Sequence, residues 1–312
     1  MSLAFVFPGQ GSQSLGMLKD LAESSPVIES TFSEASHVLG YDLWQIVQEG
    51  PLEKLNSTDI TQPAMLTAGV AVWRVWQKKA GAVPAVMAGH SLGEYTALVC
   101  AGALDFKEAV TLVAERGRLM QQAVPAGEGA MAAVLGLDDD VVRLACVDAA
   151  EGEVLEAVNF NSPGQVVVAG NKAAVERIVV LAKERGAKRA LLLPVSVPSH
   201  CALMKPAADK LAVILSDLKV TAPQIPVINN VDVKTETDPD NIRNALVAQL
   251  YSPVRWVETV QKMAAEGTDK LLECGPGKVL VGLNKRIDKS ITAMAIVDSA
   301  TLEQAVEQTL ES

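Results

Sequence analysis

The sequence predicts an α/β protein, with an α/β-hydrolase-like core built on a mostly parallel sheet and an inserted ferredoxin-like subdomain. Short apolar runs that end in Gly or Pro alternate with longer stretches of helical periodicity, which is typical of a parallel sheet covered on both faces. The pentapeptide GHSLG (89–93) stands where one such run becomes a helical stretch. Residues 129–195 follow the order β-α-β-β-α-β, which is the ferredoxin-like pattern.

The first half of the core alternates strands with helices. The expected elements are a strand at 3–7, helices at 26–48 and 62–79, a strand at 85–89, and helices at 92–104 and 106–123. The first strand, LAFVF, is a short apolar run that ends at Pro8-Gly9. Pro63 is expected in the first turn of its helix, where its missing N–H removes no hydrogen bond. Ser91 therefore lies where a strand becomes a helix.

The ferredoxin-like subdomain is expected over 127–196, which divides the catalytic core into 1–126 and 197–312. Its elements are a strand at 129–136, a helix at 138–150, strands at 153–160 and 165–170 around an NSPG turn, a helix at 172–186 and a strand at 187–195. The core then resumes with a helix at 202–217, a strand at 226–230, helices at 239–250 and 253–266, and a strand at 270–275.

Composition argues against several classes of protein. The 312 residues carry a net charge of -10 without a dense basic run, which argues against nucleic-acid binding. The four cysteines are scattered without metal-ligand spacing and are expected as free thiols in a reducing cytoplasm. Neither a basic leader nor an apolar stretch long enough to span a membrane is present. No glycine-rich nucleotide loop appears, so neither a bound cofactor nor a metal is expected.

A serine between two glycines at a strand-to-helix junction is typical of a nucleophile elbow. The tight turn exposes the hydroxyl of Ser91, and the start of the following helix points free N–H groups at any oxyanion formed there. The alternative is a structural serine in a glycine-rich turn. The strand-turn-helix context favours the nucleophile.

A serine nucleophile needs a base, and the sequence offers three histidines. His37 lies in a helical stretch, and His90 adjoins Ser91 and points elsewhere on such a turn. His200, in PVSVPSH, follows the inserted subdomain and is the predicted base. The group that orients it stays open, because no carboxylate precedes Asp209 nearby and a main-chain or amide oxygen can replace one.

Six motifs in register resemble the malonyl-CoA:acyl carrier protein transacylase family of bacterial fatty-acid synthesis. They are FPGQGSQ, GHSLGEY, AERGRLM, NFNSPGQVVVAG, PVSVPSH and ECGPGKVL, and they span essentially the whole chain. The resemblance implies that Ser91 takes malonyl from coenzyme A as an ester. It then implies transfer of malonyl to the phosphopantetheine thiol of acyl carrier protein. Coenzyme A thioester is thus a substrate and not a cofactor.

The same resemblance assigns residues to the reaction. It implies that His200 is the base and that the N–H groups of Gln10 and Leu92 form the oxyanion hole. Arg116, from AERGRLM, is the implied partner of the malonyl carboxylate, because a guanidinium binds a carboxylate through two parallel N–H bonds. The other implied site residues are Gln249, near the histidine, and the substrate-binding set Gln62, Asn161 and His90.

Two other functions fit parts of this pattern. A serine esterase or thioesterase would use the same serine and histidine with water as the acceptor, and a non-catalytic module would only bind an acyl carrier. Acyl carrier proteins of this pathway are acidic as a class, as is this chain, so docking needs a local basic patch. Two clusters are candidates, one with Lys188 and Arg189 and one with Lys285 and Arg286.

Overall fold

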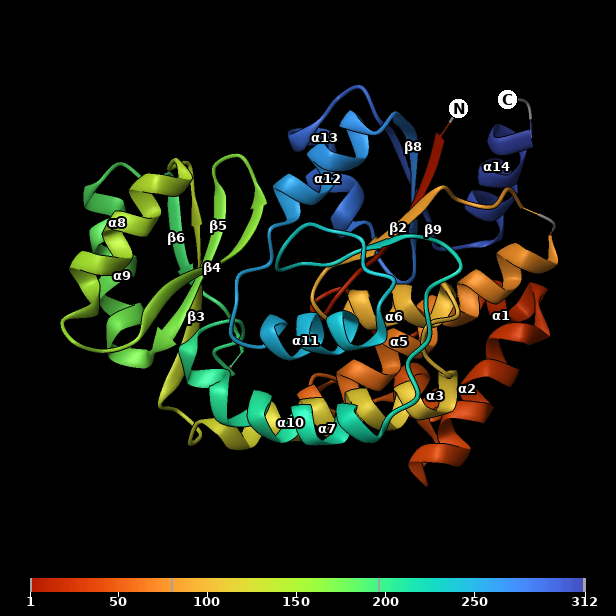
Figure 1. The fold of residues 1–312 in the computed structure, drawn as a ribbon, viewed down its shortest axis with the longest axis horizontal. Helices are drawn as coiled ribbons and strands as arrows, with labels where there is room; N and C mark the ends of the chain where they lie inside the picture. Colours follow the sequence, from red (N-terminus) through yellow and green to blue (C-terminus); the bar gives the residue numbers. More distant parts are fainter. Residues whose placement is uncertain (1, 80, 196, 311–312) are drawn as a thin grey trace.

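The computed structural model describes residues 2–79, 81–195 and 197–310 and arranges them in two lobes (Figure 1). The larger lobe is built on a five-stranded sheet of order β7-β2-β1-β8-β9, in which every neighbouring pair is parallel. Its strands are β1 (Ser2–Phe7), β2 (Val86–Gly89), β7 (Val227–Ile228), β8 (Thr268–Cys274) and β9 (Thr292–Ile296). The mostly parallel sheet predicted for the core is therefore present.

Helices cover both faces of this sheet, and the central strands β1 and β2 are accordingly apolar and buried on both sides. Leu3, Phe5 and Phe7 of β1 pack with the core of α2 (Pro26–Leu39), α5 (Thr58–Lys78), α6 (Leu92–Cys100) and α7 (Phe106–Ala123). Ala4 and Val6 face the other way, toward α12 (Trp256–Ala265) and α13 (Val279–Ile287). The remaining helices of this lobe are α1 (Lys19–Ser24), α3 (Leu43–Glu49), α4 (Leu52–Leu55), α10 (Lys205–Asp217), α11 (Pro239–Gln249) and α14 (Ser299–Leu310).

The smaller lobe is an antiparallel sheet of order β4-β5-β3-β6. Its strands are β3 (Gly129–Leu135), β4 (Leu155–Ser162), β5 (Gln165–Asn171) and β6 (Arg189–Leu192). Helices α8 (Asp139–Ala150) and α9 (Lys172–Glu184) cover its outer face, so the opposite face is turned toward the larger lobe (Figure 1). This order and these crossovers are those of the predicted ferredoxin-like unit.

The two lobes join along the edge of β4. The Phe160 N–H donates to Val254 O at 3.0 Å, and the Val254 N–H donates to Val158 O at 2.8 Å. The chain around Val254 therefore pairs with β4 after a turn, and α12 begins at Trp256, three residues later than the sequence predicts. No helix in the described part of the chain combines the length and the apolar character needed to cross a membrane.

Other predicted boundaries are wrong for identifiable reasons. The helix expected at 26–48 is two helices, because Gly40 adopts a φ of 75° and ends α2, and Asp42 then caps α3 through the Gln45 N–H.

The helix expected to start near Pro63 starts at Thr58, so Pro63 lies inside α5. Its early turn is packed against α7, where a Cβ on Gly117 would lie 2.7 Å from Thr58 O. Tertiary contact here outweighs the preference of proline for a first turn.

Candidate active site

The carboxyl ends of the parallel strands bring three loop segments together. Gln10 follows β1, Ser91 follows β2, and Asn230 follows β7. Ligands of open parallel sheets bind at this edge, because the loops after adjacent strands meet there. The cavity at this edge has a volume of about 130 Å³ and is lined by Gln10, Thr58, Gln62, His90, Ser91, Leu92, Arg116, Met120, Met131, Asn159, Leu193, Val195, Val197, Ser199 and His200.

Ser91 occupies a strained turn of the kind that the sequence predicts. Its φ of 51° and ψ of -108° are unfavourable for a residue with a side chain. The flanking glycines make the turn possible: a Cβ on Gly89 would lie 1.8 Å from the carbonyl carbon of Gly93, and one on Gly93 would lie 2.0 Å from Phe7 O. Strand and helix can therefore approach closely, and the hydroxyl of Ser91 points into the cavity.

Asn230 stabilises this turn from the neighbouring strand. Its Oδ1 accepts the Ser91 N–H at 2.7 Å, and its Nδ2 donates to Gly89 O at 2.7 Å. The side chain is fully buried, so both bonds are made away from water. One amide thus joins the two sides of the strained turn.

The hydroxyl of Ser91 lies 2.8 Å from Nε2 of His200. His200 is buried and has a φ of 68°, so both members of the pair have strained backbones. Burial, followed by the charge of Arg116, lowers the pKa of His200 to about 3. The imidazole is therefore neutral at ordinary pH and is able to accept a proton from Ser91.

The end of α11 orients His200. The ring Nδ1–H of His200 donates to the main-chain oxygen of Gln249 at 2.7 Å, and the main-chain N–H of His200 donates to Leu250 O at 2.9 Å. The last carbonyls of a helix have no N–H partner within the helix, and they carry partial negative charge. A helix terminus thus occupies the place that a carboxylate holds in many such sites.

Arg116 is 1% exposed, yet it has no acidic hydrogen-bond partner among the described residues. Its guanidinium donates to Gln62 Oε1 at 2.8 Å and to Gln249 Oε1 at 3.0 Å. One of its nitrogens also lies 3.5 Å from Ser91 Oγ. A buried cation held by neutral amides beside a nucleophile can bind an anion that arrives from outside.

Four of the other predicted site residues line the same cavity: Gln10, Gln62, His90 and Leu92. Asn161 and Gln249 do not line it but contact His90 and Arg116, which do. Leu92 is the first residue of α6, so its N–H has no acceptor within that helix. His90 forms a 2.8 Å hydrogen bond through Nε2 with Asn161 Oδ1 on β4, and this bond connects the serine turn to the smaller lobe. Gln10 lines the cavity from the loop after β1, and its Nε2–H donates to Thr58 Oγ1 at 3.4 Å.

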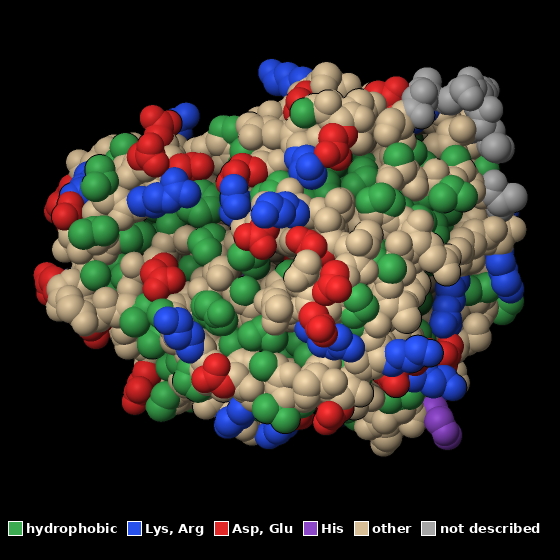
Figure 2. Space-filling view, viewed as in Figure 1, with side chains coloured by type: hydrophobic (Ala, Val, Ile, Leu, Met, Phe, Trp, Pro, Cys, Tyr) green, Lys and Arg blue, Asp and Glu red, His purple; other side chains and the backbone are tan. Residues whose placement is uncertain are grey.

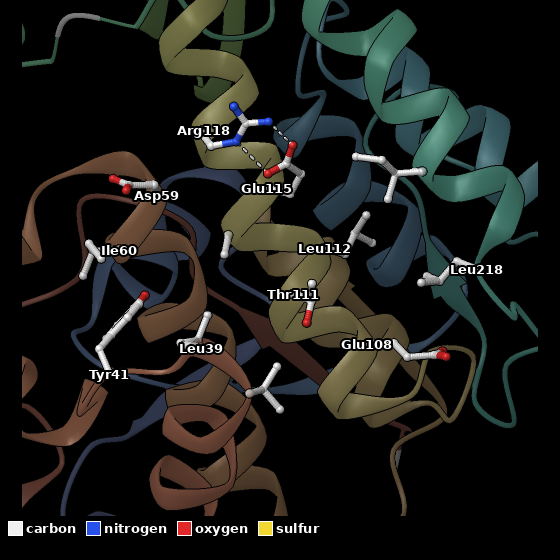
Figure 3. A pocket seen from close by; sticks show the side chains of 13 residues that line it. Leu39, Tyr41, Asp59, Ile60, Glu108, Thr111, Leu112, Glu115, Arg118 and Leu218 are labelled. Atoms are coloured by element: carbon white, nitrogen blue, oxygen red, sulfur yellow. Dashed lines mark hydrogen bonds and ion pairs between the residues drawn. The ribbon is translucent and has the colours of Figure 1, made fainter.

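A larger groove, of about 610 Å³, lies on the opposite face of α7 (Figure 3). Figure 3 shows Leu39, Tyr41 and Ile60 on one side of it, and Arg118 bonded to Glu115 on α7. None of the predicted catalytic side chains lines this groove. Because Arg116 turns inward between Glu115 and Arg118, α7 separates the groove from the candidate site.

Two buried polar residues of the site were not predicted from the sequence. Glu94 is 2% exposed and accepts hydrogen bonds from Gln249 and Asn230, and Asn230 holds the Ser91 turn. The sequence contains a signal that Glu94 is unusual, since it is an acidic residue within the apolar stretch LGEYTALVC.

Within the described ranges, no cluster of three or more acidic, His or Cys side chains is arranged to hold a metal ion.

Comparisons with known proteins agree along the chain. A family model described as an acyl transferase domain matches residues 4–306. The chain is 62% identical over 304 residues to malonyl CoA-acyl carrier protein transacylase of Escherichia coli strain K12, covering 97% of this chain and 98% of that protein. It is 65% identical, with a TM-score of 0.96, to the structure of an acyl carrier protein S-malonyltransferase from Vibrio cholerae O1, covering 97% of this chain and 99% of that one. A type II PKS malonyl-transacylase in complex with its acyl-carrier protein is 61% identical with a TM-score of 0.98, covering 99% of this chain and 100% of that one.

Proposed function

The chain belongs to the acyl transferase domain family, and on that premise we propose that it transfers malonyl from malonyl-CoA to the phosphopantetheine thiol of an acyl carrier protein. The product supplies fatty-acid synthesis with its extender unit. The observation that carries the assignment is the buried guanidinium of Arg116, 3.5 Å from the hydroxyl of Ser91. It places a carboxylate receptor beside a nucleophile, and malonyl has a carboxylate at the far end of its acyl group.

In the first half-reaction, Ser91 Oγ attacks the thioester carbonyl carbon while His200 Nε2 takes the hydroxyl proton. The negative charge that develops on the carbonyl oxygen is stabilised by the N–H groups of Gln10 and Leu92, and one such donor contributes about 3 kcal/mol to lowering the barrier. The carbon–sulfur bond then breaks, and the imidazolium returns its proton to the coenzyme A thiolate. The enzyme is left as a malonyl ester.

The second half-reaction runs the same groups in reverse. The carrier thiol gives its proton to His200 and its sulfur attacks the ester carbonyl. The bond from carbon to Ser91 Oγ breaks, and the proton returns to the serine. Every proton passes through one imidazole that is neutral at rest, and these steps need no bound cofactor.

Arg116 selects the acyl group in this scheme. Gln62 and Gln249 hold the guanidinium in place with neutral oxygens, so in the described site no protein carboxylate accepts its hydrogen bonds and the malonyl carboxylate can do so. An acetyl group would leave the buried guanidinium without an anion. A site built around a polar group discriminates strongly against an analogue that lacks the matching group.

The rival enzyme function is hydrolysis by the same serine and histidine. The cavity of about 130 Å³ is walled partly by Met120, Met131 and Leu193, which favours retention of the ester until a thiol arrives. The test is coenzyme A release from malonyl-CoA without carrier. Transfer predicts one burst equal to the enzyme present and a malonyl adduct on Ser91, absent in Ser91→Ala. Sustained release identifies a hydrolase, and no adduct at all identifies a binding module.

For carrier docking we propose a surface made by both predicted basic clusters. Arg189, Leu135 and Gln165 are paired across β6, β3 and β5, so their side chains share one face of the small sheet. Arg286 of α13 donates to Gln165 Oε1 at 2.9 Å, which brings the second cluster to the same face. Lys and Arg side chains, with acidic ones among them, gather where the small lobe meets α12 and α13 (Figure 2).

This face leads to the nucleophile. Leu193 and Met131 line the cavity, and Arg189 lies four residues before Leu193 on the same face of the sheet, about 13 Å away along an extended strand. A carrier bound at Arg189 and Arg286 could therefore extend its arm along the sheet toward Ser91.

We place the reaction in the cytoplasm, in keeping with the four free cysteine thiols of the chain.

A further inference from the structure

A buried acidic side chain lies behind the site and takes no part in the proton transfers. Glu94 is the third residue of α6 and is 2% exposed. Burial raises its pKa to about 7, against the opposing effects of its hydrogen bonds and of Arg116. Burying a carboxyl costs free energy unless hydrogen bonds satisfy its oxygens.

One oxygen of Glu94 accepts two hydrogen bonds that lead to the site. Its Oε2 accepts the Asn230 N–H at 2.9 Å and the Gln249 Nε2–H at 2.8 Å. Asn230 in turn holds the Ser91 turn, and Gln249 holds Arg116 through its side chain and His200 through its main chain. Three catalytic groups are therefore connected to a single acceptor atom.

The orientation of the Gln249 amide depends on that acceptor. Its Nε2 faces Glu94 and Ser91 O, the latter at 3.0 Å, while its Oε1 faces Arg116. In the reversed orientation the amide hydrogens would face the guanidinium, and donor would meet donor. Glu94 places an acceptor oxygen beside the Gln249 amide. It therefore favours the orientation in which Nε2 faces Glu94 and Oε1 accepts from Arg116.

We propose that Glu94 is a positioning residue for acyl transfer, fixing the Gln249 amide and the Asn230 main chain so that Arg116, His200 and Ser91 are held in register. The inference rests on the proposed function and names a residue that acts through others. The charged or titratable groups that face Glu94 are Arg116 on α7 and the Tyr95 phenol on α6.

The test uses Glu94→Ala and Glu94→Gln. Alanine removes the acceptor, whereas glutamine can place its carbonyl oxygen where Oε2 lies and accept both bonds. Glu273→Ala is the matched control: Glu273 is a buried carboxyl on β8 with a pKa raised to about 7, and it accepts the Leu280 and Val281 N–H groups at 3.1 and 2.8 Å. It does not line the catalytic cavity.

Two readouts separate positioning from general loss of structure. The first is the rate of malonyl-serine formation from malonyl-CoA in a rapid-quench experiment, and the second is labelling of Ser91 by a fluorophosphonate, which has no carboxylate for Arg116. We expect Glu94→Ala to slow malonyl loading about 10- to 100-fold and labelling by a smaller factor, with Glu94→Gln restoring most of both rates. Glu273→Ala should remain within about twofold of the original protein in both.

Other outcomes overturn the inference. It fails if Glu94→Ala loads malonyl as fast as the original protein, or if both rates fall by the same factor as the folded fraction. It also fails if Glu94→Gln is as slow as Glu94→Ala. Absence of malonyl-Ser91 in the unsubstituted protein would instead contradict the proposed function, so the two failures are distinguishable.

Discussion

The imidazole of His200 donates its Nδ1–H to the main-chain oxygen of Gln249 at 2.7 Å, at the last turn of α11. A carbonyl fixes the tautomer as well as a carboxylate does, and the helix terminus adds partial negative charge without a full anion. The arrangement matters beside Arg116, because a buried carboxylate in that position would compete with the substrate for the guanidinium. Orientation of the base and recognition of an anionic acyl group are thus compatible in one small site.

The first prediction concerns pH. Burial and Arg116 lower the pKa of His200 to about 3, so the neutral base persists as the solution becomes more acidic. The rate constant for malonyl loading should change less than about twofold between about pH 8 and pH 5. Protonation of Glu94 in this range leaves its carbonyl oxygen as an acceptor. A rapid-quench pH series measures this, and a rate that halves near pH 6.5, the ordinary value for histidine, would contradict the geometry.

The second prediction concerns Arg116→Met, which keeps much of the side-chain volume and removes the guanidinium. Malonyl loading should fall about 100-fold or more, because two charge-assisted hydrogen bonds to the substrate carboxylate are lost. Fluorophosphonate labelling of Ser91 should fall far less. Arg118→Met is the control on the same helix, since Arg118 is exposed and bonded to Glu115, and it should behave like the original protein. Equal losses in both assays would assign Arg116 to structure.

The third prediction concerns the strained serine turn. Asn230→Ala removes the amide that bonds the Ser91 N–H and Gly89 O, and both rates should fall about 10-fold or more. The adjacent Asn229→Ala is the control, because Asn229 Oδ1 accepts only the Asp232 N–H of a neighbouring turn. Labelling kinetics and thermal unfolding of both variants measure the effect. Comparable activity in the two variants would mean that the glycines alone hold the turn.

The sequence predicts the main elements because their apolar periodicity is local. The helix expected at 106–123 matches α7 residue for residue. The sequence also predicts the serine turn from two glycines, and the structure shows why both are needed: a Cβ on either one would lie within 1.8 or 2.0 Å of a backbone atom. Roles for Ser91 and His200 followed from residue type and order along the chain. These features depend on neighbours in sequence or on side-chain chemistry alone.

Features that depend on distant contacts were missed. β9 was not predicted, because TAMAI is short and weakly apolar, and it becomes a strand by pairing in parallel with β8. Asn230 acts through a residue 139 positions away, and no local pattern marks it. Glu94 lies within the motif GHSLGEY, yet its partner Gln249 comes from a different helix. A main-chain oxygen orients His200, and the sequence does not predict this choice because a carbonyl has no sequence signature.

The fourth prediction concerns stability and Glu273. Its pKa is raised from 4.5 to about 7 in the folded protein, chiefly by burial. A group with a raised folded pKa contributes stability that is full below its unfolded pKa and is lost as pH rises through its folded pKa. The free energy of unfolding of the original protein should therefore fall, relative to Glu273→Gln, between about pH 5 and pH 8. Denaturant unfolding at several pH values measures the difference, and parallel curves would contradict it.

The fifth prediction concerns the proposed docking surface, where Arg286 on α13 is bonded to Gln165 at the start of β5. Reversing the charge of Lys188 with Arg189, or of Lys285 with Arg286, should weaken transfer to an acidic carrier and leave malonyl-serine formation unchanged. Added salt should reduce the rate of transfer to the carrier more in the original protein than in either variant. Salt screens the attraction between the basic surface and the acidic carrier, and the variants no longer have that attraction.

The two pairs should also be coupled, because Arg189 and Gln165 lie on the same face of the sheet and Arg286 contacts Gln165. Combining both reversals should therefore produce a loss that differs from the product of the single losses. Lys78 with Lys79 at the end of α5, away from the small lobe, is the control pair for net charge. If reversing Lys78 and Lys79 slows the carrier as much as either basic cluster does, long-range repulsion explains the effect and the surface is placed wrongly.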